Sequence, residues 1–85
     1  MVNPEVKYRL DLLLDSQSLE RADTLRREFY ADFNGKLSKE DIQYISSKID
    51  ETCGTPYSRL DKPDRELLNQ KAMLGSVLFS MGKES

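Results

Sequence analysis

Apolar residues recur every three or four positions along most of this chain, which is the spacing of one face of an α-helix. No segment shows the strict alternation of apolar and polar residues that is typical of a half-buried strand. Three stripes of helical spacing consist of Val6, Leu10, Leu13 and Leu14, then of Leu19, Ala22, Leu25, Phe29 and Phe33, and finally of Ile42, Ile45 and Ile49. The pattern therefore predicts an all-α protein.

Capping residues and helix breakers predict where each helix begins and ends. Asn3 before Pro4 is typical of a helix start, and Gly35 favours the left-handed conformation that ends a helix. Ser38, with an acidic residue three positions later, indicates another start. Because the connections are short, neighbouring helices are expected to run antiparallel. The prediction is a small four-helix bundle-like domain of residues 1–85, with helices at about 4–15, 17–33, 39–53 and 62–81, a loop at 55–60 and a frayed tail at 82–85.

The segment from Ala72 to Met81 carries no charge, and its apolar residues fall on nearly every side of a helix. A helix that is apolar all round is expected to be buried all round. Either the other helices of the same chain surround it, or a second chain covers the sides that they leave open. The second alternative predicts a protein-binding surface, with an antiparallel homodimer as its simplest form. Its residues would be Met73, Ser76, Val77, Ser80 and Met81.

The net charge of the chain and the length of its apolar run limit the kinds of partner that the sequence predicts. The 13 basic and 15 acidic residues give a formal net charge of −2. Such a near balance provides no strong field for nucleic acid or anionic lipid, so nucleic acid is the less favoured partner and no membrane partner is expected. The first residues lack the basic and apolar stretches of a secretory signal. The apolar run near the end is too short to span a bilayer, which takes about 20 residues. We therefore expect a cytoplasmic protein.

Residue types needed for catalysis and metal binding are scarce. The chain has no histidine, which removes the commonest general base and a leading zinc ligand. Its single cysteine, Cys53, is predicted near the negative end of a helix dipole, where a reactive thiolate is disfavoured. Asp32, Asn34 and Gly35 resemble the start of an EF-hand calcium loop, but Lys36 occupies a position that needs an oxygen ligand. The sequence thus predicts no catalytic residue, no metal site and no cofactor.

Residues 31–48 are similar to a DNA-binding helix-turn-helix. Ala31 supplies the small residue of that motif and Gly35 its turn glycine. The resemblance implies a transcriptional regulator that reads DNA through this hairpin. Glu40 and Asp41, at the start of the second helix, would face phosphates unfavourably. The contact residues would be Lys36, Lys39, Gln43, Ser47 and Lys48.

The lack of catalytic chemistry and the one strongly apolar helix together favour a function by contact. The leading hypothesis is a small adaptor, regulatory or inhibitor protein that binds another protein, itself, or both. The DNA-binding hairpin at 31–48 is the alternative. An enzyme is not expected, because the pattern of residues contains neither a placed general base nor a group of metal ligands.

Overall fold

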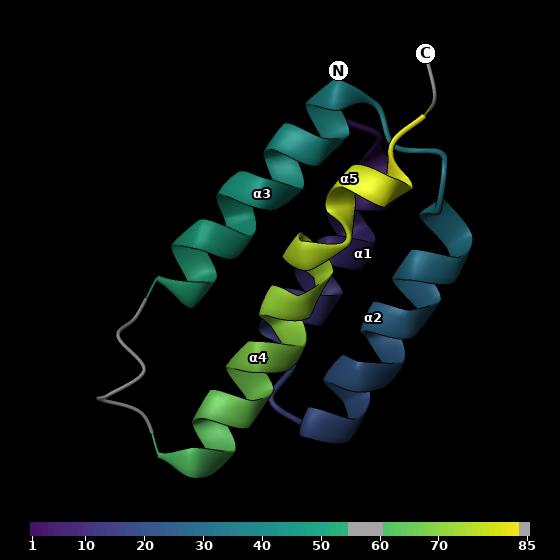
Figure 1. Cartoon of the computed structure of the whole chain (residues 1–85). Coiled ribbons are helices and arrows are strands. Elements are labelled where there is room, and N and C mark those ends of the chain that lie inside the picture. Colours follow the sequence, from purple (N-terminus) through teal and green to yellow (C-terminus); the bar gives the residue numbers. More distant parts are fainter. Residues whose placement is uncertain (55–60, 84–85) are drawn as a thin grey trace.

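The computed structural model describes residues 1–54 and 61–83 as a bundle of α-helices (Figure 1). Within these residues no extended strand forms, so the predicted all-α class is confirmed. The predicted loop at 55–60 and the last part of the predicted tail, 84–85, lie outside the described residues. The helices are α1 (Pro4–Asp15), α2 (Leu19–Phe33), α3 (Lys39–Cys53), α4 (Lys62–Ser76) and α5 (Leu78–Met81).

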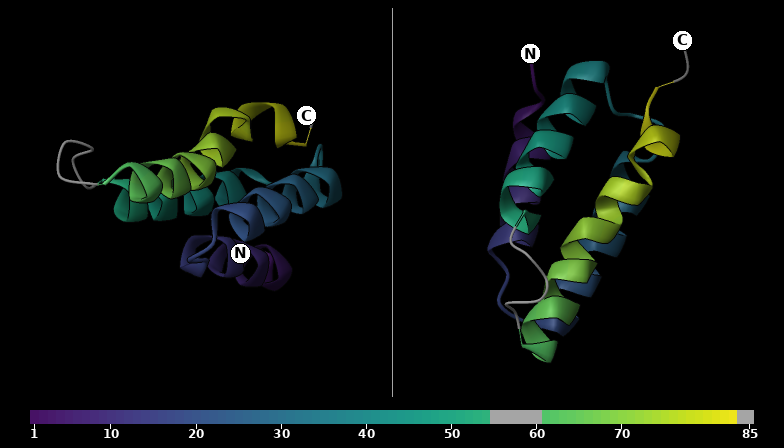
Figure 2. Two further views of the ribbon diagram at one scale, coloured as in Figure 1. Left: turned by 90° about the horizontal axis from the view of Figure 1, so that it is seen from below. Right: turned by 60° about the vertical axis from the view of Figure 1, so that its left-hand side comes forward.

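The four long helices run alternately in opposite directions along the bundle (Figure 1). α4 packs against α2 and α3, and α1 packs against the same two helices from the other side (Figure 2). α2 and α3 therefore lie on either side of α4 and not against each other. The molecule measures 41 × 22 × 20 Å, with its helices along the longest dimension. None of the described helices is long and apolar enough to cross a membrane.

Side-chain caps define the starts of the first helices. The Asn3 side chain accepts a hydrogen bond from the Glu5 N–H at 2.9 Å, as the prediction for this start requires. The Ser18 hydroxyl accepts one from the Arg21 N–H at 3.3 Å, which places the start of α2 slightly later than predicted. After α2, Gly35 adopts a φ of 76°, a left-handed conformation that would strain a residue with a side chain.

The predicted apolar stripes meet in one buried core. Leu19 is an exception, because it lies in the first turn of α2 and is 40% exposed. Burial of each large apolar side chain contributes about 1.5–3 kcal/mol, so this cluster is the main source of stability. The core consists of Val6, Leu10, Leu13, Ala22, Leu25, Phe29, Phe33, Leu37, Ile45, Ile49, Leu74, Leu78 and Met81.

The predicted single helix at 62–81 is interrupted at Val77. Val77 has a φ of −111° and a ψ of 2°, and its N–H donates to the carbonyl of Leu74, one residue closer than in a regular α-helix. The hydroxyls of Ser76 and Ser80 also donate to carbonyls three residues back, at 2.7 and 2.8 Å. Because such bonds bend helices, the prediction of one continuous helix is wrong. The short α5 packs against α3 beyond the bend.

The segment after α5 is joined to the connection between α2 and α3. The Leu37 N–H donates to the Met81 carbonyl at 3.2 Å, and the Lys83 N–H donates to the Leu37 carbonyl at 2.8 Å. These bonds form a parallel bridge between Leu37 and Gly82. A Cβ at Gly82 would lie 3.0 Å from the Ile42 side chain, so this close approach favours glycine. The prediction of a frayed tail is therefore wrong for its first two residues.

Lys71 links α4 to the C-terminal end of α1. Its side chain is buried, and its ammonium donates to the Leu14 carbonyl at 2.6 Å. That carbonyl belongs to the last turn of α1, where carbonyls lack partners within the helix. Burial lowers the pKa of the Lys71 ammonium, because the charged form loses hydration. The contact ties α4 to α1 across the bundle.

Asp41 secures both the start of α3 and the chain before α1. Its carboxylate accepts hydrogen bonds from the N–H of Asn3 at 3.0 Å and from the N–H of Ser38 at 3.1 Å. The Ser38 hydroxyl accepts from the Asp41 N–H, which completes the predicted capping box. Burial by itself raises the pKa of the Asp41 carboxyl, but these hydrogen bonds and the charge of Lys83 outweigh it, so the net pKa is lowered.

The Asp41→Asn substitution should destabilise the protein by about 1–3 kcal/mol at neutral pH, because the amide offers one acceptor oxygen for two N–H donors. Since the folded pKa is lowered, the stabilisation by the carboxylate is present above the unfolded pKa of about 4 and is lost as the pH falls through the folded pKa. Urea denaturation from neutral to acid pH measures this, with the exposed Glu40→Gln variant as control. If the difference in free energy of unfolding between the native chain and Asp41→Asn does not become smaller at acid pH, this role of Asp41 is contradicted.

Candidate nucleic-acid interface

Three exposed lysines gather at one end of the bundle. Lys36 precedes the bridged Leu37, Lys83 follows the bridged Gly82, and Lys39 opens α3. The connection between α2 and α3, the start of α3 and the end of α5 all lie at this end (Figure 1). We call Lys36, Lys39 and Lys83 the lysine end.

Carboxylates near the lysine end already have partners. Asp41 is held in its capping hydrogen bonds, and Glu40 is paired with the amino group of Met1. Among residues 1–54 and 61–83, no carboxylate lies within ion-pair distance of the three ammonium groups. Lys83 lowers the pKa of Asp41, which places its charge near that buried group. Because these lysines are exposed, an added phosphate can pair with their ammonium groups.

The outward side of α4 and α5 forms a second surface. Its exposed residues follow one another at helical spacing, and we call them the outer strip: Lys62, Arg65, Glu66, Asn69, Met73, Ser76 and Ser80. The strip begins at the start of α4 and ends, beyond the bend, on α5 beside the lysine end (Figure 1). Phe79, next to Ser80 on α5, is also exposed.

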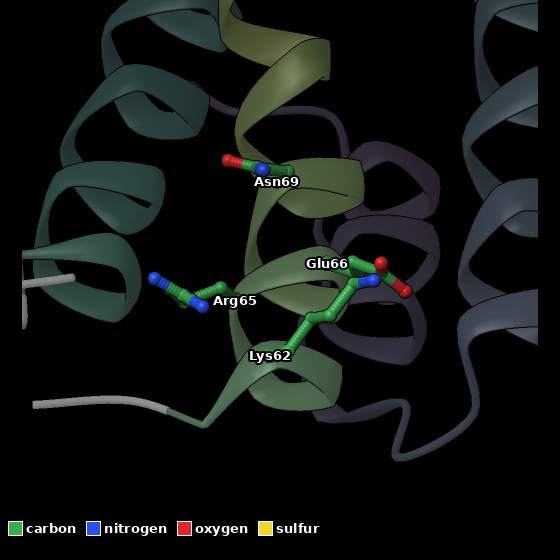
Figure 3. Close-up of a pocket in the computed structure, with 4 residues that line it drawn as sticks. All are labelled: Lys62, Arg65, Glu66 and Asn69. Atoms are coloured by element: carbon green, nitrogen blue, oxygen red, sulfur yellow. The ribbon is translucent and has the colours of Figure 1, made fainter. Parts of the chain in front are cut away.

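An open hollow of about 400 Å³ lies at the start of α4 and is lined by residues of the outer strip. Arg65 and Asn69 extend to one side of the helix, while Lys62 and Glu66 extend to the other (Figure 3). Two cations, an amide and the Glu66 carboxylate line the hollow, and the exposed Asp61 and Asp64 lie in the same turn of the chain. Cations and amides contact phosphates and sugars in nucleic-acid complexes.

Carboxylates are absent from most of the outer strip. From Leu67 to Lys83 the sequence contains neither aspartate nor glutamate. The other long helices interleave acids with bases, and Arg9, Arg26 and Arg27 are each paired with a carboxylate. A polyanion that lies along α4 toward the lysine end therefore meets little like-charge repulsion.

A further basic group lies across α1 and α3. The Nζ of Lys7 lies 5.6 Å from the centroid of the Tyr44 ring, and the Nζ of Lys48 lies 5.9 Å from it. Lys48 also lies 3.7 Å from a carboxylate oxygen of Glu51. Because both cations already interact with the ring or with an acid of the same chain, they are less suited to a polyanion than the lysine end.

The residues predicted to bind a protein partner do not share one surface. Met73, Ser76 and Ser80 belong to the outer strip. Val77 is half-buried at the bend, and Met81 is fully buried in the core. The prediction is therefore wrong for Met81, because the bend after α4 turns this residue inward.

Of the two alternatives for the C-terminal helix, the one in which the same chain surrounds it on all sides is wrong. Leu74 and Leu78 face the core, whereas Phe79 is 90% exposed. The set of site residues predicted from the sequence left out Phe79. It also left out the cations at the two ends of the outer strip, which are Lys62, Arg65 and Lys83. A signal for them exists in the sequence, namely a stretch without carboxylates that has cations before and after it.

The residues predicted to contact DNA are divided between two places. Lys36 and Lys39 belong to the lysine end. Gln43 and Ser47 are exposed further along α3, and Lys48 extends toward the Tyr44 ring. The structure thus brings only part of this set together.

The hairpin at 31–48 does not form a helix-turn-helix. In that motif the two helices pack against each other at a steep angle, and the second enters the major groove. Here α2 and α3 lie on either side of α4 (Figure 2). The physical reason is Leu37, which is buried and bridged to Gly82, so that the connection is held against the end of α5. The predicted helix-turn-helix arrangement of residues 31–48 is therefore wrong.

No protein-family model matches this chain, and no solved structure matches it. Among curated proteins, the chain is similar to one from Pyrococcus abyssi that is named RNA-binding protein PAB1135, with 44% identity over 62 residues. The match covers 68% of this chain but 35% of the relative. The chain thus spans about a third of the length of the curated relative that it matches.

This similarity contradicts the leading hypothesis from the sequence, that of a protein–protein interaction module. The relative is named for binding RNA, a class of partner that the sequence predicted to be less favoured because of the net charge. The net charge does not describe how bases and acids are distributed along the chain. The stretch from Leu67 to Lys83, which forms most of the outer strip, contains no carboxylate.

The Met81→Ala substitution should destabilise the fold by about 2–5 kcal/mol, because truncation of a fully buried methionine leaves a cavity. Met73→Ala, on the outer strip, is the matched control and should change the free energy of unfolding by no more than about 0.5 kcal/mol. Urea denaturation at neutral pH measures both. Similar effects of the two substitutions would contradict the inward position of Met81.

Proposed function

We propose that this chain binds RNA and that it acts by binding, not by catalysis. The observation that carries the proposal is the 44% identity over 62 residues to a protein named as RNA-binding. The matched segment includes most of this chain, so the similarity supports a role for the helical bundle itself. Binding through ion pairs and hydrogen bonds needs neither a cofactor nor a reactive group. We also infer a cytoplasmic location.

A local positive surface is needed for this function, because the whole chain carries a net charge of −2. The Debye length is about 8 Å at physiological ionic strength, so a phosphate responds mainly to nearby charges. The lysine end supplies three cations, and Lys62 with Arg65 supplies two more at the start of α4. The two groups are roughly 30 Å apart along the helices. This arrangement supports an RNA strand that lies along the outer strip.

The middle of the outer strip offers uncharged contacts for nucleotides. The Asn69 amide can both donate and accept hydrogen bonds. The hydroxyls of Ser76 and Ser80 donate to carbonyls of their own helix, and each oxygen can still accept a bond from outside. Contacts of this kind reach sugars and base edges, while the cations at the two ends hold phosphates.

The chain should bind an unstructured, fluorescently labelled oligoribonucleotide with an affinity that falls as salt rises. Each neutralised phosphate of a single strand contributes about 0.7 to the slope of log K against log salt, so five engaged cations would give a slope of about −3.5. Anisotropy titrations between about 50 and 200 mM salt measure it. Absence of binding at low salt, or an affinity that does not depend on salt, would exclude the proposed function.

The double substitution Lys36→Ala with Lys83→Ala should weaken RNA binding and make the salt slope shallower by about 1.4, because two phosphate contacts of a single strand are lost. The matched control is Lys7→Ala with Lys48→Ala, which removes the same charge from the face shared by α1 and α3. The control should change affinity little. If the control pair weakens binding as much as the first pair, the interface does not lie at the lysine end.

A further inference from the structure

Phe79 is an exposed apolar residue on α5, and no contact among the residues that the structure describes explains its exposure. Its ring is 90% exposed, whereas its neighbours on α5, Leu78 and Met81, are buried. These two side chains and the hydrogen bonds to Leu37 hold α5 in place. Exposure of a phenyl ring forgoes the stabilisation that burial of such a side chain provides. The ring is therefore available for contact with a ligand.

The position of Phe79 connects the outer strip with the lysine end. A Cβ placed on Gly82 would lie 3.8 Å from the carbonyl oxygen of Phe79 and 3.8 Å from that of Leu37. The backbones that carry Phe79 and Leu37 are thus close together. Lys36 precedes Leu37 and Lys83 follows Gly82, so the backbone that carries the ring adjoins the two segments that carry these exposed lysines.

We propose that Phe79 stacks on an unpaired base of single-stranded RNA whose phosphates lie on Lys36 and Lys83. This inference rests on the proposed RNA-binding function and adds the class of RNA. Aromatic side chains beside a cationic groove are the common means of holding single strands, because every base has a face that can stack. Bases inside a duplex are already stacked on one another, and the major groove of A-form RNA is too narrow for side chains to read.

The charges around Phe79 favour a polyanion over an apolar protein surface. The stretch from Leu67 to Lys83 contains no carboxylate, and the lysines at its end form no ion pair among the residues that the structure describes. A protein partner would have to leave these ammonium groups uncompensated or supply acids of its own. Phosphates on both sides of a stacked base satisfy them directly.

The test compares substitutions at Phe79 in the full chain. Phe79→Ala and Phe79→Leu remove the ring, and they should weaken binding of an unstructured oligoribonucleotide roughly 5- to 150-fold. Phe79→Tyr keeps a ring and should retain the affinity. Tyr8→Ala is the matched control, because it removes another exposed aromatic residue from α1, which packs on the far side of the bundle from α4. Circular dichroism verifies that each variant is folded.

Two further measurements separate stacking from attraction to phosphates. Inorganic polyphosphate carries the charge without bases, so its binding should not change in Phe79→Ala. The chain has no tryptophan, so a Phe79→Trp variant carries a single indole whose fluorescence should be quenched by the oligoribonucleotide and not by polyphosphate. A duplex of the same length should bind more weakly than the single strand and leave the indole unquenched.

Several outcomes would overturn the inference. If RNA binds but Phe79→Ala binds it as well as the native chain does, the ring has no role in binding and only the broader RNA proposal survives. Equal loss in Tyr8→Ala, or a preference for the duplex, would likewise refute stacking at Phe79. If Phe79→Ala abolishes self-association in sedimentation experiments and leaves RNA affinity unchanged, the ring serves an interface between copies. Failure of the native chain to bind any RNA at low salt would remove both proposals.

Discussion

The bridge between Leu37 and Gly82 is the contact on which the arrangement of both candidate surfaces depends. Two hydrogen bonds join segments that lie far apart in the sequence, and they hold α5 against the start of α3. To reach this position the last helix bends at Val77. The bend buries Met81, exposes Phe79 and brings Lys83 to the same end of the bundle as Lys36. A straight helix would present a different set of residues at each of these places.

Asp41 is an ionised carboxylate at the same end of the bundle as the lysines. Its oxygens accept hydrogen bonds from the N–H groups of Asn3 and Ser38, and its charge also acts on Lys83. Those bonds keep the pKa of the buried carboxyl low, and they hold it inside the fold. The same interactions cap α3 and fix the chain before α1. Stability and surface charge are thus coupled through a single side chain at this end.

The local charge on the surface of this chain differs from what its net charge suggests. A net charge of −2 indicates no affinity for phosphates, yet acids are concentrated on α1, α2 and α3, where several of them pair with arginines. The outer strip carries Lys62, Arg65 and Glu66 at its start and uncharged residues from Asn69 to Ser80, beyond which the lysine end follows. At physiological ionic strength an anionic ligand would respond to this local pattern more than to the net charge.

The sequence alone determined the elements of this protein, because helix periodicity and capping depend on residues within one or two turns of each other. The stripes of apolar residues and the caps at Asn3 and Ser38 predicted all-α architecture and most helix ends correctly. The tertiary structure alone decided the inward turn of Met81, the exposure of Phe79 and the bridge that holds Gly82 and Lys83. The bridge to Leu37 holds the end of α5 in place, and the free energy of such a contact between distant segments cannot be read from local spacing. The candidate surface was therefore only partly predictable, since its lysines and its aromatic ring come from segments that meet only in the folded chain.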